Sequence, residues 1–253
     1  MSFSQTYFLK TTNFFTFFRL VLFCLIAIFT TSCKTIDEPV FGDTATDVDG
    51  NVYHTVTLGS QTWMIENLQT TRYNDGTTIP LVTDSAAWTN LMTPGYCWYN
   101  NSDSLPKVNK YGALYNWYSV NTSKLAPKGW HIPSDEEWTT LQYNVSKYNY
   151  LSGSLSKILA ATTNWETTTS NLSIGSNLQK NNSSGFTALP SGFRANSTAY
   201  FSLIGSEGIW WTTNLNDNKT ARCISLIYNL TTVERAYKPY QSGLSVRCIK
   251  DVN

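Results

Sequence analysis

The chain has 253 residues, which is enough for one large domain or two small ones. Its formal net charge is +1 and charged residues make up 14% of it, so electrostatics give no reason to expect nucleic acid or another polyanion as a partner. Aromatic residues also make up 14%, and Asn, Ser and Thr are frequent, which predicts an aromatic core beneath a neutral, polar surface.

Residues 1–33 have the pattern of a bacterial lipoprotein signal peptide. Lys10 and Arg19 precede an apolar run at 20–29, which is shorter than the roughly 20 residues that a membrane-spanning helix needs. Small residues follow and end at Cys33, the expected site of diacylation, although Thr30 stands where Leu is usual. The alternatives are ordinary signal cleavage and an uncleaved anchor.

Several acyl chains on Cys33 would anchor the protein permanently in the outer membrane. The acidic residues at 37 and 38 resemble the surface-export signals of Bacteroidetes lipoproteins, so we expect exposure at the cell surface, with the periplasmic face as the alternative. Residues 34–45 show little hydrophobic pattern and are interpreted as a tether, and residues 46–253 as one folded domain.

The cysteines allow for a disulfide but do not predict a metal site. Cys24 lies in the apolar run, which leaves Cys97, Cys223 and Cys248 in the folded domain. Export permits a disulfide, but three thiols leave one unpaired. The chain has 2 histidines and no Cys/His spacing typical of zinc, so we do not expect a metal site built on imidazole.

The folded domain begins with a predicted β-hairpin, in which a turn at Gly59 connects strands at 52–58 and 63–65. Just before it, Asp47, Asp49 and Asn51 place oxygen ligands on alternate residues, as in half of a calcium loop, but the distal bidentate Glu is lacking. A solvated turn is the favoured interpretation. We therefore expect no cofactor, and calcium is the alternative.

The middle of the chain predicts short elements. A short helix is expected at 84–91 and an aromatic strand at 95–101. The stretch 111–120 predicts another helix, because its apolar residues fall at i, i+3, i+4 and i+7 and are expected in the core: Tyr111, Leu114, Tyr115 and Tyr118.

A capping box predicts the next helix. Ser134 is the expected N-cap and Glu137 follows three residues later, directly after a brief strand at 130–132. The acids at 135–137 lie where the helix dipole favours negative charge, so they are interpreted as caps rather than as a catalytic pair. His131 stands between two apolar residues and is interpreted as a structural histidine rather than as a general base.

The last third is rich in predicted strands. A helix is expected at 155–161, followed by strands at 185–189, 192–194, 199–203, 209–213, 221–227 and 244–249. Within it, Trp210 and Trp211, followed by Asn214, Asn216 and Asp217, could form an exposed carbohydrate or cation surface. Trp98, Trp165 and Trp211 are expected at the surface, and the candidate ligand contacts are Trp98, Trp211, Asn214 and Asp217. One buried tryptophan before a polar hairpin loop is the favoured interpretation.

Seven phrases together identify a family resemblance: DGNVYHTVTLGSQTWMIENLQTTRYNDGTTIP, PGYCWYNN, YGALYNWYSV, KGWHIPSDEEWTTL, SGFTALPSGFR, GSEGIWWTTN and GLSVRCIKD. In this order they resemble the Fibrobacter succinogenes major paralogous domain, which is common in surface proteins of Bacteroidetes and Fibrobacteres. The resemblance covers residues 46–251. That family is similar in turn to C-type-lectin-like domains and, more loosely, to the formylglycine-generating-enzyme fold.

The resemblance implies an α+β, C-type-lectin-like single domain with antiparallel sheets, two flanking helices and long loops. Its closing strand would lie beside the N-terminal one. The Glu-Pro-Asn and Trp-Asn-Asp strings of sugar-binding lectins do not occur here, nor does the copper-site cysteine pair of formylglycine chemistry.

The resemblance also bears on the disulfide. Family members often carry a cysteine where this chain has Ala126, which leaves Cys248 to pair with Cys223, with Cys97 or with neither. Because Cys223 is unusual at its place in the family, Cys223–Cys248 is the favoured pair.

From these features we expect a lipid-anchored surface module that binds or adheres to a glycan or a protein and is not an enzyme. The alternatives are a structural role in an envelope complex and a hydrolase of polysaccharide that would use acids such as Glu66, Asp75 or Glu207. Three residues also resemble Bacteroidetes O-glycosylation sites, since each follows Asp and precedes an apolar residue: Thr44, Ser85 and Ser104.

Overall fold

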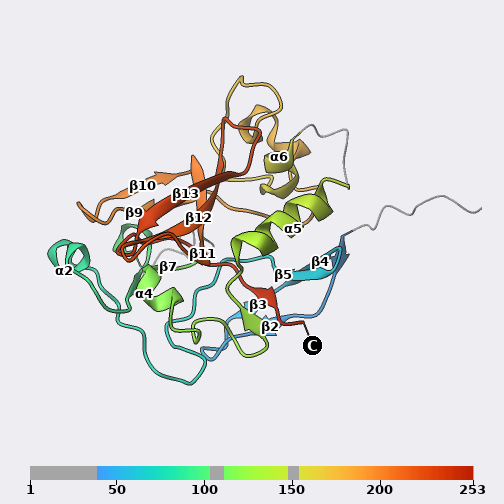
Figure 1. The fold of residues 1–253 in the computed structure, drawn as a ribbon. Coiled ribbons are helices and arrows are strands. Elements are labelled where there is room, and N and C mark those ends of the chain that lie inside the picture. Colours follow the sequence, from blue (N-terminus) through green and yellow to red (C-terminus); the bar gives the residue numbers. More distant parts are fainter. Residues whose placement is uncertain (1–38, 103–110, 148–153, 253) are drawn as a thin grey trace, which may run out of the picture. The chain divides into compact units, whose positions relative to one another are not determined.

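The computed structural model describes residues 39–102, 111–147 and 154–252 (Figure 1). The described residues all belong to one compact unit, Asp37–Asn253. The expected signal peptide, Cys33 and Ser104 lie outside the described residues. No helix in the described part of the chain has the length and apolar character that crossing a bilayer requires.

The fold is α+β with antiparallel sheets. The main sheet has five strands in the order β1 (Val40–Phe41), β4 (Thr55–Leu58), β5 (Gln61–Met64), β14 (Ile249–Lys250) and β8 (Trp130–His131). A three-stranded sheet contains β11 (Glu207–Leu215), β12 (Thr220–Ile227) and β13 (Glu234–Pro239). The remaining strands form pairs: β2 (Ala45–Thr46) with β3 (Val52–Tyr53), β6 (Tyr96–Cys97) with β7 (Leu114–Tyr115), and β9 (Ser191–Arg194) with β10 (Phe201–Ile204).

The helices are short. They are α2 (Ser85–Thr89), α4 (Trp117–Val120), α5 (Asp135–Val145) and α6 (Leu155–Leu159), with 3-10 turns at Tyr99–Asn101, Ile174–Ser176 and Leu178–Lys180. The predicted capping box of α5 is confirmed. Ser134 Oγ accepts the Glu137 N–H at 3.2 Å, and a Glu137 carboxylate oxygen accepts the Ser134 N–H at 2.8 Å.

Helix α5 packs between the two larger sheets, beside β4 and β12 (Figure 1). The ring of Trp138 on α5 lies 5.1 Å from that of Trp63 on β5 and 5.9 Å from that of Trp210 on β11. All three indoles are fully buried. Tilted aromatic pairs at this spacing add to the stabilisation that burial of their apolar area provides, so this cluster fixes the start of α5 relative to both sheets.

The predicted hairpin is confirmed as β4 and β5, which pair from Thr55 opposite Met64 to Leu58 opposite Gln61. Gly59 forms its turn at φ +64°, a left-handed conformation that glycine adopts without a steric penalty. The closing strand β14 lies between β5 and β8, as the family resemblance implied.

The structure corrects two predictions, one about the tether and one about the helix at 111–120. Residues assigned to the tether belong to the fold: β1 pairs with β4, and β2 pairs with β3. The predicted helix at 111–120 is wrong in its first half, where β7 pairs with β6, and only α4 is helical. Asn116 separates the two, because its side chain accepts the Ser119 N–H and begins the helix there.

The late strands agree with the prediction in part. Strands β9 to β12 lie where they were expected, whereas 185–189 forms no strand and 244–249 is reduced to isolated bridges before β14. Strand β13 was not predicted.

Two buried cationic side chains, Lys157 and Arg247, connect long loops to the rest of the fold. Lys157 donates to the carbonyls of Ser173, Ile174 and Asn177 at 2.9–3.3 Å. Arg247 is fully buried, donates to Asn67 Oδ1 at 2.8 Å and lies 4.4 Å from the Phe186 ring centroid. Burial lowers the pKa of Arg247 to about 9. Buried charges of this kind are costly unless they are hydrogen-bonded, so these contacts have a structural role.

Candidate functional site

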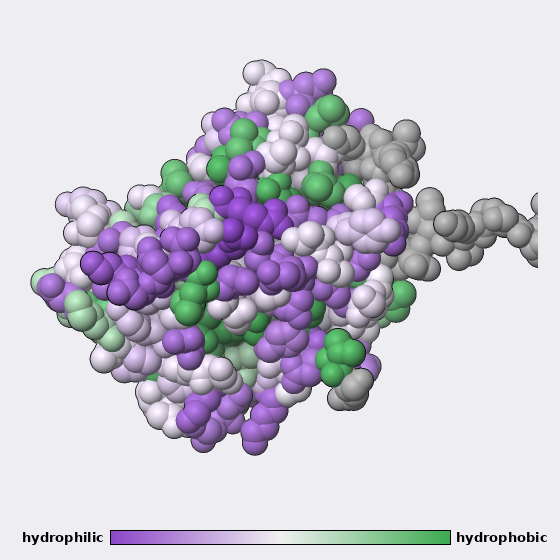
Figure 2. Space-filling model, viewed as in Figure 1, coloured by the Kyte–Doolittle hydropathy of each residue, from purple (hydrophilic) through white to green (hydrophobic). Residues whose placement is uncertain are grey.

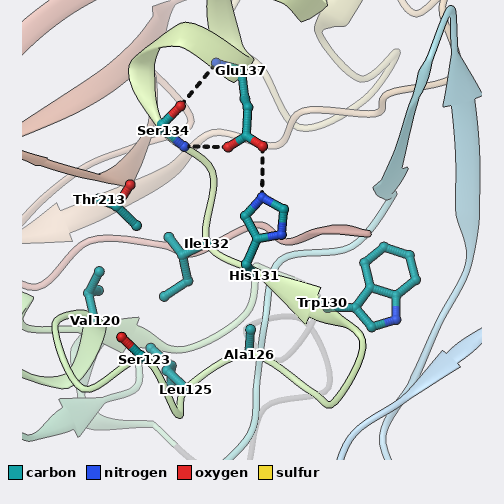
Figure 3. A pocket seen from close by; sticks show the side chains of 10 residues that line it. All are labelled: Val120, Ser123, Leu125, Ala126, Trp130, His131, Ile132, Ser134, Glu137 and Thr213. Atoms are coloured by element: carbon teal, nitrogen blue, oxygen red, sulfur yellow. Dashed lines mark hydrogen bonds and ion pairs between the residues drawn. The ribbon is translucent and has the colours of Figure 1, made fainter. Parts of the chain in front are cut away.

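A cavity of about 470 Å³ opens beside the junction of β8 and α5 (Figure 3). The end of α4, the segment that follows it, β8, the start of α5 and the end of β11 all contribute to its wall. The residues that line it are Val120, Ser123, Leu125, Ala126, Trp130, His131, Ile132, Ser134, Glu137 and Thr213. This volume is within the range of about 300–1,000 Å³ that is usual for small-molecule sites.

The cavity combines an apolar floor with a rim of hydroxyl groups. Its apolar residues are buried members of the core: Val120, Leu125, Ala126 and Ile132. The hydroxyls come from Ser123, Ser134 and Thr213. Trp130 is half-buried and borders the cavity, with its indole directed away from the other lining residues (Figure 3). Such a lining suits a ligand that has both apolar faces and many hydroxyl groups.

His131 lies between two carboxylates. Its Nε2 is 2.7 Å from Glu137 Oε1 and its Nδ1 is 2.7 Å from Asp251 Oδ1. Figure 3 shows the imidazole pointing to Glu137 at the start of α5, while the indole of Trp130 points away from it. Burial lowers the pKa of His131, but the two carboxylates raise it by more, so the pKa lies above its ordinary value.

The molecular surface seen in Figure 2 is mostly polar. On the face seen in Figure 2, hydrophilic side chains dominate, and apolar side chains form only small groups between them.

The family model of the Fibrobacter succinogenes major domain matches residues 56–250. The chain belongs to this family. No curated protein and no solved structure matches the chain. Trp130, His131 and Glu137 all lie inside the matched part of the Fibrobacter succinogenes major domain, and Asp251 follows directly after it.

The structure does not bring the four candidate ligand contacts of this Fibrobacter succinogenes major domain together as one surface. Trp211 is fully buried and donates from Nε1 to the Tyr115 carbonyl at 2.8 Å, so it is not an exposed ligand contact. Trp210 is fully buried as well, whereas the favoured interpretation expected one buried tryptophan. Trp98 is half-buried against Tyr96, with ring centroids 6.0 Å apart. Trp165, also expected at the surface, is buried.

Asn214 and Asp217 have local structural roles. Asn214 Oδ1 accepts the Asp135 N–H at 2.7 Å, which adds a second cap to α5. Asp217 Oδ1 accepts the N–H groups of Lys219 and Thr220 at 2.7 and 2.6 Å and closes the turn between β11 and β12. These bonds agree with the favoured prediction of a polar hairpin loop.

The half-calcium loop is a hydrogen-bonded turn in this structure. Asp47 Oδ1 accepts the N–H groups of Asp49 and Asn51 at 2.9 and 3.0 Å, and Asp47 Oδ2 accepts the Tyr53 hydroxyl at 2.6 Å. Asp49 pairs with Arg72 at 2.5 Å. Within residues 39–102, 111–147 and 154–252, no group of three or more His, Cys, Asp or Glu side chains is placed to hold a metal ion.

The disulfide predicted for this domain is not formed in the structure, where Cys97, Cys223 and Cys248 are buried free thiols. The Cys223 thiol, on β12, donates to the Ala236 carbonyl of the neighbouring strand at 3.4 Å. Burial raises the pKa of both Cys97 and Cys223 to about 12, so neither is a reactive thiolate at neutral pH.

The acids considered for a hydrolase are dispersed. Glu66 accepts the His54 N–H at 2.8 Å, and Asp75 pairs with Lys124 at 2.8 Å. Burial raises the pKa of Glu207, which lies on β11. None of these three acids lines the cavity.

Sequence reasoning treated Trp130 only as a strand residue and His131 as a structural histidine, and it did not single out Thr213 or Asp251. The local signal was present for one contact: a histidine in a brief strand and the N3 glutamate of the following helix are six residues apart. No local signal connects His131 with Asp251, which is 120 residues away.

Proposed function

We propose that this domain is a non-enzymatic module that binds carbohydrate in the cavity beside Trp130 and is held at the cell surface by lipid on Cys33. The observation that carries the proposal is the lining of the cavity, which combines an apolar floor and three hydroxyl side chains with the half-buried Trp130 at its edge. Sugars present apolar C–H faces to aromatic rings and hydroxyls to polar groups, so they match both parts of this lining.

The contacts of His131 favour binding over catalysis. Both ring nitrogens are engaged by carboxylates, so the imidazole has no free nitrogen with which to act as a general base. Glu137 in turn accepts the Ser134 N–H in the capping box. This hydrogen-bonded group therefore serves as a rigid polar wall.

The antiparallel α+β fold and the position of β14 beside β5 support the finer proposal of a lectin-like architecture. The carboxylates of Asp47 and Asp49 are occupied by internal hydrogen bonds. We therefore propose that carbohydrate binding is independent of calcium.

The test is a glycan array probed with the lipid-free chain of residues 34–253 and with Trp130→Ala. The matched control is Trp98→Ala, which removes another half-buried indole that does not line the cavity. We expect binding to at least one glycan class, a loss of tenfold or more in Trp130→Ala, little change in Trp98→Ala, and no effect of EDTA. An empty array, or equal binding by Trp130→Ala and wild type, would overturn the proposal.

The location is tested on intact cells by protease digestion of the native protein, with Cys33→Ala as the control for anchoring. Digestion without lysis is expected. Protection of the wild-type protein until lysis would contradict surface display.

A further inference from the structure

A row of side chains crosses the main sheet on one face. Val40 lies opposite Thr57, and Thr57 lies opposite Thr62. Lys250 lies opposite Trp130 at the other side of the sheet. The pairing of Ile249 with Trp63 places Lys250 next to Thr62, so the row continues without a gap from β1 to β8.

This row lies on the face of the main sheet opposite α5. Successive residues of a strand point to opposite faces of the sheet, and the neighbouring row, which contains Val56, Trp63 and Ile249, is buried under α5. In the row itself, Val40 and Lys250 are exposed, whereas Thr57, Thr62 and Trp130 are half-buried. Since adjacent strands are about 4.8 Å apart, the five strands give the row a length of roughly 19 Å.

A groove of about 320 Å³ lies over most of this row. One wall is the segment that leads from β1 to β2, which contributes Gly42, Asp43 and Thr44. Thr55, Thr57, Thr62, Lys250 and Trp130 form the rest.

Trp130 lines both the groove and the cavity beside His131. We propose that the carbohydrate site continues past this indole into the groove, so that the module recognises a linear oligosaccharide of several units instead of a single terminal sugar. This inference rests on the proposed function, because it extends the same site.

The groove has the chemistry that such a chain requires. The hydroxyls of Thr57 and Thr62 are 2.9 Å apart, and each retains further capacity to donate or accept a hydrogen bond. The exposed Lys250 ammonium is a donor and the exposed Asp43 carboxylate an acceptor. Together they match sugar hydroxyls, which both donate and accept, and they carry no net charge that would select a charged polymer.

The test measures affinity against chain length by calorimetry. The probes are cello-, xylo-, manno- and chito-oligosaccharides of one to six units, and the protein is residues 34–253. The groove variant is Thr57→Val with Thr62→Val, which removes two hydroxyls while keeping the side-chain volume and β-branching. The matched control is Thr140→Val on the exposed side of α5.

For wild type and Thr140→Val, we expect affinity to rise tenfold or more between two and five units of the series that binds. The groove variant should bind the disaccharide as wild type does and lose most of the gain for longer chains. Thermal melting that is unchanged by more than a few degrees would show that the groove variant is folded.

The outcomes separate the two proposals. Affinity that does not change with length, or a groove variant that matches wild type on long chains, would overturn the extended site while binding that depends on Trp130 would still support the proposed function. If no oligosaccharide of any length binds, both proposals fail.

Discussion

Glu137 accepts hydrogen bonds from two directions: the backbone N–H of Ser134 at 2.8 Å and the imidazole of His131, 2.7 Å from its other oxygen. One carboxylate thus begins α5 and fixes the position of a residue in β8. Changes at any of these three residues should therefore affect both the stability of the domain and the shape of the cavity.

We expect the stabilisation by His131 to depend on pH. The pKa of His131 is raised above its ordinary value, so its contribution is fully present below about pH 6.5 and is lost as the pH rises through the folded-state pKa. The difference in free energy of unfolding between wild type and His131→Gln should be larger at about pH 5.5 than at about pH 9. Urea unfolding at the two pH values measures it, with His54→Gln as the control, and a difference that is independent of pH would contradict the assignment.

Ser134→Ala should destabilise the domain by about 1 kcal/mol, because the N–H of Glu137 loses its acceptor. Thr140→Ala, on the exposed part of the same helix, should stay within about 0.5 kcal/mol of wild type. Urea midpoints at constant m-value measure both changes. Equal midpoints for the two variants would show that the capping box contributes little.

Substitution of Asp135 should lower the stability of the domain more than substitution of its neighbour Glu136. Its two oxygens are 2.6 Å from Arg222 Nη1 and 2.7 Å from Arg235 Nε, and its side chain is 11% exposed. Asp135→Asn leaves two guanidinium groups without their carboxylate and should cost about 3 kcal/mol in free energy of unfolding. The neighbouring Glu136→Gln is the matched control, expected within about 0.5 kcal/mol of wild type.

The thiols of the native domain should be unreactive. Cys97, Cys223 and Cys248 are buried, and burial raises the pKa of all three. Residues 34–253 should show no reaction with Ellman's reagent at neutral pH when folded, and three thiols per chain in denaturant without reductant. One thiol per chain in denaturant would instead demonstrate a disulfide.

The parts of the fold that short-range physics determines were predictable. The N-cap at Ser134 and the turn at Gly59 both depend on residues within a few positions of one another, and both are confirmed. The helical spacing at 111–120 was misleading, because Leu114 and Tyr115 are buried from a strand and only Tyr118 of the predicted stripe lies in the helix, where it is half-buried.

Features that depend on distant partners were not predictable. Strand β13 carries Glu234, Arg235 and Lys238, and it is a strand because β12 pairs with it along its whole length. Trp210 and Trp211 alternate across β11, and each enters a different buried cluster. A strand that is buried on both faces gives no alternation of polar and apolar residues, so the sequence could not distinguish an exposed tryptophan from a buried one.

The candidate site likewise depends on residues far apart in the sequence and was not predictable. Its cavity takes residues from α4, β8, α5 and β11, and the groove takes them from every strand of the main sheet except β1, together with the segment that follows β1. Trp130 is important because of its register opposite Lys250, and register between strands that are 120 residues apart cannot be read from local patterns.

Because the fold begins at β1, only a short segment separates the folded domain from Cys33. Val40 comes seven positions after Cys33 (40 − 33 = 7), and a fully extended segment of that length spans at most about 25 Å. With lipid on Cys33, this segment would hold the β1 edge of the main sheet within that distance of the bilayer. A polysaccharide would then have to lie close along the cell's own surface to be captured, which favours retention of chains already delivered there over attachment to distant objects.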